Sequence, residues 1–169
     1  QGVALADEGM HPCPMDFEAW NESLFFDWVS SDGSEAGHCR IGLHPGQGRI
    51  WFWLYMRHGV HWVGIDRPAL PLGELPDQTW SCETEGLRYR RDVLRALQTN
   101  RLEVEGIGYV LGGPNKGDPV SVQVDLVFEA AGPAHGMAQR TFPWTDGQVY
   151  QAARYEQPCD VMGHLRIGE

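Results

Sequence analysis

RIWFWLYMRHGVHWVGID, residues 49–66, is the stretch that decides the fold. Apolar and aromatic side chains fill it on both sides of His58-Gly59, a pair that tolerates the positive φ angles of a two-residue turn. We therefore predict a β-hairpin with its turn at these two residues, in which Arg57 pairs with Val60. Further along this register Trp51 would face the last residue of the stretch, Asp66.

The two faces of this hairpin differ in their chemistry, because side chains alternate across a strand. One face is aliphatic and carries Ile50, Phe52, Leu54, Met56, Val63 and Ile65. The other is aromatic with polar edges and carries Arg49, Trp51, Trp53, Tyr55 and Trp62; in the predicted register Tyr55 faces Trp62 and Trp53 faces Gly64. We interpret the aliphatic face as core and the aromatic face as a wall that meets a ligand.

Composition bounds the class of protein. The chain has 169 residues, of which 42% are hydrophobic, and this suits one globular domain. Its formal net charge of −10 argues against nucleic acid and against anionic membrane surfaces as partners, since both favour basic patches. No apolar run is long enough to cross a bilayer as a helix, so we expect no transmembrane segment.

Four cysteines stand at positions 13, 39, 82 and 159, with wide spacings and no CxxC pair. Such a pattern does not resemble a disulfide framework, and it favours buried, reduced thiols in a cytoplasmic protein. No signal-peptide pattern opens the sequence.

Short strands are predicted through most of the chain, and we place them at residues 23–30, 37–44, 78–84, 87–92, 101–111, 119–129 and 155–168, besides the aromatic hairpin. The strand at 119–129 is the clearest, because Val120, Val122, Val124, Leu126 and Phe128 alternate with mostly polar residues. Residues 93–99 predict one short helix with Asp92 as its N-cap. Residues 132–153 read as irregular.

Many short strands separated by turns predict an all-β fold: an antiparallel, lipocalin-like barrel or sandwich of about eight to nine strands with one short helix. Residues 1–22, broken by Pro12 and Pro14, predict an irregular N-terminal arm. Residues 23–169 predict a single antiparallel β domain.

Seven histidines raise the question of a metal site. The pairs His58/His61, His11/Cys13 and His38/Cys39 lack the spacing of zinc ligands, so we predict no metal. The loop GGPNKGD lacks the spacing of a phosphate-binding loop, and no GxSxG nucleophile motif occurs. We also predict no cofactor.

Four strand carboxylates are the candidate catalytic groups: Asp27, Asp66, Asp125 and Glu156. Each is flanked by apolar or aromatic residues. A carboxylic acid in an apolar cavity has a raised pKa and can donate a proton near neutrality. The structural alternative is a carboxylate that faces solvent or pairs with an arginine.

Tryptophan is abundant, with seven residues in the chain, and three of them gather on one face of the hairpin. The candidate ligand-binding residues are the aromatic side chains of three strands: Trp28, Trp51, Trp53, Tyr55 and Trp62. A small barrel could use such a face as the wall of a pocket for an apolar molecule. The alternative is that these rings only pack the strands together.

The hairpin, the VQVDLVFEA stretch and the C-terminal RYEQPCDVMGHLRIGE resemble the lipocalin-like family that includes hydroxyneurosporene synthase, a carotenoid hydratase. The resemblance covers residues 20–169. In that family a second β-rich half follows with an RDHSWG-like segment, which this chain lacks. The chain therefore resembles a first half alone. A second half-domain chain or a homo-oligomer as partner, or a truncated product, would each account for this.

The resemblance implies a hydratase or cyclase acting on an apolar isoprenoid or polyketide-like substrate. An acid, one of the four carboxylates, would protonate an alkene, and the aromatic rings would stabilise the resulting cation. Two other classes of function stay open. One is a binding protein without catalysis, and the other is an interaction subunit whose aromatic face is covered by another chain.

Overall fold

The computed structural model describes residues 2–12, 18, 20–73, 80–84, 86–143 and 149–168. Its strands are β1 (Glu22–Val29), β2 (Glu35–His44), β3 (Arg49–His58), β4 (His61–Pro71), β5 (Trp80–Thr84), β6 (Leu87–Arg95), β7 (Thr99–Val110), β8 (Pro119–Ala130), β9 (His135–Pro143), β10 (Val149–Glu156) and β11 (Cys159–Ile167). Two short 3₁₀ helices span Leu5–Glu8 and Pro45–Gln47. The predicted all-β fold is confirmed.

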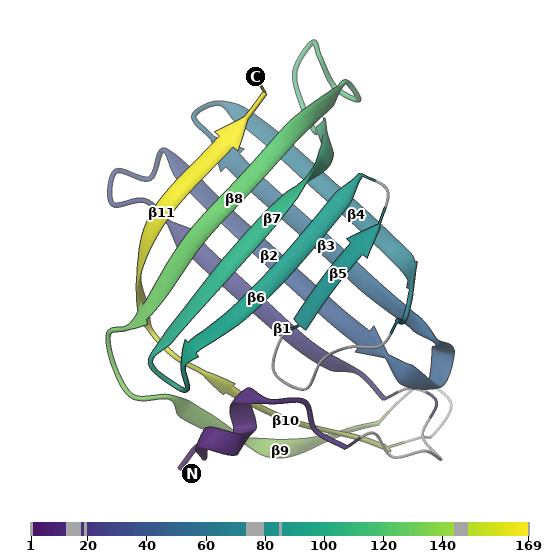
Figure 1. The fold of residues 1–169 in the computed structure, drawn as a ribbon, viewed down its shortest axis with the longest axis vertical. Coiled ribbons are helices and arrows are strands. Elements are labelled where there is room, and N and C mark those ends of the chain that lie inside the picture. Colours follow the sequence, from purple (N-terminus) through teal and green to yellow (C-terminus); the bar gives the residue numbers. More distant parts are fainter. Residues whose placement is uncertain are drawn as a thin grey trace.

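Nine strands form one antiparallel sheet, and β9 pairs with β10 in a separate hairpin. Figure 1 shows β5, β6, β7, β8 and β11 as a front layer that crosses β1 to β4 behind it. The layers join where the end of β7 pairs with the start of β4. In the described part of the chain β1 pairs only with β2 and β11 only with β8, so the barrel is open between these edges.

The core lies between the two layers and follows the period-2 pattern of the sequence. All six residues of the predicted aliphatic face are at most 2% exposed. The alternating residues Val122, Val124, Leu126 and Phe128 of β8 point into the same core. Trp80 and Tyr89 fill much of the remaining interior, at 1% exposure each. The inside of the barrel is therefore packed with side chains.

The turn of the aromatic hairpin lies one residue later than predicted. His58 pairs with His61, so Gly59 and Val60 form the turn, and Gly59 has a φ of 58°. Trp53 therefore lies opposite Asp66 and Tyr55 opposite Gly64. The partners predicted for Arg57, Tyr55, Trp53 and Trp51 are all wrong. From Phe52 to Arg57 each partner is displaced by two residues, an even number, so these side chains keep their predicted faces.

The predicted helix at 93–99 is wrong. Strand β6 continues to Arg95, a turn follows, and β7 starts at Thr99. Asp92 is not an N-cap, because it lies within β6 opposite Arg101. The helical preference of residues 93–99 is local and weak, and pairing of β6 with β7 along their length outweighs it.

Residues 132–153 are also more regular than predicted, because they contain β9 and most of β10. These strands pair from Val149 with Pro143 to Glu156 with His135. Figure 1 shows the hairpin crossing the lower end of the barrel, beside the N-terminal segment. This hairpin closes the end of the barrel at which β1 begins.

The described cysteines agree with the prediction of free thiols. Cys39 and Cys82 are buried and Cys159 is half-buried, and all three are unpaired. Cys13 lies outside the described residues. No helix in the described ranges is long and apolar enough to cross a membrane.

Candidate functional site

A cavity of about 670 Å³ is lined by residues of β1, β6, β7 and β8, of the N-terminal segment and of the β9–β10 hairpin. Its apolar wall comes from Leu24 and Phe26 of β1 and Phe128 of β8. The rings of Phe26 and Phe128 pack with their centroids 4.8 Å apart. The mouth of a β-barrel is a common place for a small-molecule site, and this volume lies in the usual range for one.

Two segments cover the cavity. Gly9 and His11 come from the N-terminal segment, and His135 and Tyr155 come from the β9–β10 hairpin. Alternation explains why the polar residue Arg91 reaches the cavity from β6. Leu87, Tyr89 and Arg91 point inward along this strand, and Arg91 is the one nearest the end of the barrel.

A buried polar cluster lies at one side of the cavity. The Arg91 guanidinium forms an ion pair with the Glu8 carboxylate, and its Nε donates to Asn100 Oδ1 at 2.9 Å. Tyr155 Oη donates to Glu8 Oε1 at 2.5 Å. Burial, followed by this contact with Glu8, raises the pKa of the Tyr155 hydroxyl, so Tyr155 stays protonated and acts as a donor.

Charged side chains form the rim of the cavity. His11 Nδ1 lies 2.9 Å from Glu22 Oε1, and Asp7 lies 3.8 Å from the other ring nitrogen. The hydrogen bond to Glu22 raises the pKa of His11, although partial burial opposes the shift. Across the cavity Arg154 pairs with Glu156 at 3.4 Å.

Two of the four predicted carboxylates, Asp27 and Glu156, line this cavity. Asp27 Oδ1 lies 2.5 Å from His38 Nδ1, and 62% of its side chain is exposed. The Glu156 side chain is 51% exposed. Both side chains are therefore more than half exposed to solvent.

The other two carboxylates lie away from the cavity. Asp125 accepts two hydrogen bonds from Arg101, at 2.9 and 2.8 Å, and this pairing lowers its pKa. Asp66 accepts hydrogen bonds from Trp51 Nε1 at 3.1 Å and Tyr55 Oη at 3.4 Å. Asp125 therefore has the arginine partner of the structural alternative.

The predicted aromatic wall lies on the outer face of β3 and β4, not around the cavity. Trp51 and Trp53 are half-buried, with their centroids 4.9 Å apart, whereas Tyr55 and Trp62 are exposed. The guanidinium of Arg40 lies 4.5 Å from the centre of the Trp53 ring, a cation–π contact. Trp28 is separate from this group, because it points into the core. Ligand binding by these residues stays a prediction.

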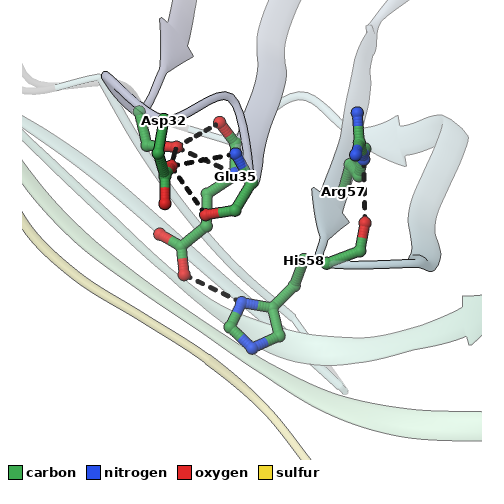
Figure 2. A network of polar contacts seen from close by, with 7 residues as sticks. Asp32, Glu35, Arg57 and His58 are labelled. Carbon is green, nitrogen blue, oxygen red and sulfur yellow. Dashed lines mark hydrogen bonds and ion pairs between the residues drawn. The ribbon is translucent and has the colours of Figure 1, made fainter.

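The opposite end of the barrel carries a polar network that supports its turns (Figure 2). Asp32 accepts hydrogen bonds from Ser30 and Ser34 within the β1–β2 turn, and these bonds lower its pKa to about 2. His58 Nδ1 lies 2.9 Å from Glu35 Oε1, which ties β3 to β2. These contacts stabilise local structure far from the cavity.

Glu8, Arg91 and Tyr155 form the polar side of the site, and none of them was predicted as a site residue from the sequence. Arg91 carried a usable signal, because it continues the inward alternation of Leu87 and Tyr89 and so places a charge on the apolar face. Glu8 and Tyr155 carried none. Their positions depend on how the N-terminal segment and β10 cover the barrel.

In the described residues no group of three or more histidine, cysteine or acidic side chains could hold a metal ion. No curated protein and no solved structure matches the chain. The family model described as a domain of unknown function, DUF7064, matches residues 4–169, and the chain therefore belongs to the DUF7064 family.

Proposed function

We propose that this protein binds an apolar small molecule, of isoprenoid or polyketide-like kind, in the cavity at the mouth of the barrel. The observation that carries the proposal is a space of about 670 Å³ with an apolar wall of Leu24, Phe26 and Phe128 beside a polar cluster. Binding sites for small molecules commonly combine a mostly apolar lining with a few placed polar groups. The barrel-like fold is compatible with such a role.

Ligand binding is tested with N-phenyl-1-naphthylamine, an uncharged apolar probe that fluoresces when it leaves water. Leu24→Gln places an amide in the apolar wall, so we expect probe affinity to fall about tenfold, as burial of one unpaired polar group predicts. Val29→Ser is the matched control, because Val29 lies on the same strand and is 70% exposed. Equal probe affinity for both variants would refute binding in this cavity.

A hydratase or cyclase reaction at the same site is the finer proposal, and the resemblance to the carotenoid hydratase family supports it. A protonated carboxyl would transfer its proton to one alkene carbon, which leaves a cation on the other. Water would then attack that carbon, and the proton it releases would return to the carboxylate. Of the four candidate acids we propose Asp27 and Glu156, since these line the cavity.

Incubation with an isoprenoid alkene in H₂¹⁸O tests this reaction, because the product alcohol would carry the label. Asp27→Asn and Glu156→Gln each remove one acid, and the variant that loses the acid should lose about 10²-fold or more in rate. Asp125→Asn is the control, because Asp125 lies away from the cavity in an ion pair with Arg101. Full turnover in both cavity variants would eliminate these acid assignments.

A second candidate function is the interaction subunit, and exposed apolar side chains on the outer face of β4 and β7 favour it. Trp62 is 50% exposed and Tyr109 45% exposed. Leu111 joins them, because its backbone N–H donates to the Trp62 carbonyl at 2.8 Å. Contiguous exposed apolar surface often marks a protein interface. Sedimentation of the wild type against Trp62→Ser tests this role, since only an oligomer that uses this face would dissociate in the variant.

A further inference from the structure

The buried cluster beside the cavity has the composition of a receptor for a carboxylate. A guanidinium group and a hydroxyl donor, from Arg91 and Tyr155, converge on one carboxyl group. Arginine matches carboxylates particularly well, because its planar fork offers several N–H donors to two oxygens. In this protein the carboxylate is supplied by the chain itself, through Glu8.

The Glu8 carboxylate, bound by Arg91 and Tyr155, is almost completely shielded from water. The Glu8 side chain is 5% exposed and the Arg91 side chain 2%. Arg91 Nη1 also donates to the Glu8 backbone carbonyl at 3.0 Å, so the N-terminal segment is held through both the side chain and the main chain of Glu8. Arg91 lines the cavity, and its positive charge is neutralised by Glu8, which is not itself a lining residue.

The electrostatics of the cavity follow from this neutralisation. The charge of Glu8 offsets that of Arg91. The other arginine among the described lining residues is Arg154, and it pairs with Glu156. The rim also carries Asp7, Glu22 and Asp27, together with the histidines His11 and His135. His11 pairs with Asp7 and Glu22, so carboxylates still outnumber the cationic groups of the lining. A ligand carboxylate that entered the cavity would lie near carboxylates of the same charge. It would also find Arg91 already paired with Glu8. Both effects disfavour binding of an anionic ligand.

We propose that Glu8 is the specificity-determining residue of the cavity, and that it restricts the ligand to an apolar molecule whose polar end is neutral or positively charged. This inference rests on the proposed function, because it requires that the cavity binds a ligand. It adds the class of head group, which the apolar wall alone leaves open.

Three probes with the same C12 chain and different head groups test the inference: dodecanoate, dodecanol and dodecylamine. Each competes with N-phenyl-1-naphthylamine at pH 7.5, below its aggregation concentration. We expect dodecanoate to bind the wild type about tenfold or more weakly than dodecanol, and dodecylamine to bind at least as tightly as dodecanol. Tightest binding of dodecanoate would overturn the proposal.

The variant Glu8→Gln tests whether Glu8 causes the weak binding of carboxylates. The variant keeps the shape of the side chain and removes its charge, so Arg91 becomes available and dodecanoate should bind about tenfold more tightly, with dodecanol within about twofold of the wild type. Glu105→Gln is the matched control, because Glu105 lies outside the cavity lining in an exposed ion pair with Arg88, so dodecanoate should still bind weakly. Unchanged dodecanoate affinity in Glu8→Gln would overturn the assignment.

The double variant Glu8→Gln/Arg91→Gln separates charge from shape. It has no uncompensated guanidinium, and we expect it to gain no affinity for dodecanoate. If Glu8→Gln fails to fold, the ranking of head groups by the wild-type protein still decides whether carboxylates are rejected. Failure of all three probes and of the naphthylamine would overturn the proposed function and this inference with it, whereas preference for dodecanoate would overturn this inference alone.

Discussion

Gly37→Ala tests how tightly Trp28 is packed into the barrel, the residue of the predicted ligand-binding set that the structure buries. Trp28 pairs with Gly37 across β1 and β2, and its indole lies directly over the glycine. A Cβ built at Gly37 would lie 2.0, 2.4 and 2.7 Å from three atoms of the indole. Carbon atoms in contact prefer a separation of about 3.5–4.0 Å, so the ring must move by about 1.5 Å.

The size of the effect follows from this overlap. Forcing an extra methyl group into a packed core costs about 1–3 kcal/mol. Alanine lowers the conformational entropy of the unfolded chain and offsets roughly 0.5–1 kcal/mol of that cost. We expect a net loss of about 1–2 kcal/mol in the free energy of unfolding, which corresponds to a fall of about 2–8 °C in Tm for a chain of this size.

Urea unfolding followed by tryptophan fluorescence measures the loss, with a thermal scan as the second readout. Gly112→Ala is the matched control, because nothing lies within 4 Å of its Cβ position, and it should change stability by less than about 0.5 kcal/mol. The double variant Gly37→Ala/Trp28→Leu should show favourable coupling of about 1 kcal/mol, since the smaller side chain relieves the overlap.

Equal stability of Gly37→Ala and Gly112→Ala would refute the packing of Trp28 over Gly37. Trp28 would then be free to move, and a role in ligand binding would become more plausible. A destabilised Gly37→Ala without coupling to Trp28→Leu would show that the cost arises elsewhere in β2.

Three further predictions concern ionisable groups. The pairing of His11 with Glu22 raises the pKa of His11. The contribution of this pair to stability is therefore complete below about pH 6.5 and is lost as pH rises through the higher folded-state pKa. The Tm difference between wild type and His11→Gln should be larger at pH 5.5 than at pH 8.5. The pairing of Asp125 with Arg101 lowers the pKa of Asp125, so its contribution to stability is present above about pH 4 and declines in stronger acid. The stability difference between wild type and Asp125→Asn should therefore be smaller at pH 2 than at pH 7, and an equal difference would contradict the ion pair. Cys39 is fully buried and burial raises the pKa of its thiol, so iodoacetamide should label it, by peptide mass, only after unfolding in urea.

The sequence by itself determined which side chains share a face. Alternation along 49–66 and 119–129 separated the buried residues from the outer ones correctly, because the period of a strand is a local property of its backbone. That separation even survived a misplaced turn. The displacement between the predicted and observed partners is an even number of residues, so Trp53 and Phe52 stayed on their predicted faces.

Only the tertiary structure decided which face encloses space. A barrel has one interior, and the aliphatic residues of β3 and β4 fill it, so the aromatic face of Trp51 and Trp53 lies outside. The same holds for residues 93–99, whose weak helical preference yields to the pairing of β6 with β7. The local sequence pattern of neither stretch predicts these contacts, because they form between segments that are far apart in the chain.

The polar side of the cavity depends most strongly on tertiary structure. Glu8, Arg91 and Tyr155 come from the N-terminal segment, β6 and β10, and they meet only because the two covering segments close the same end of the barrel. Sequence patterns report on neighbours along a strand, so Arg91 could be recognised as an inward charge beside Tyr89. Its partner could not, because a contact between distant segments is a property of the folded chain.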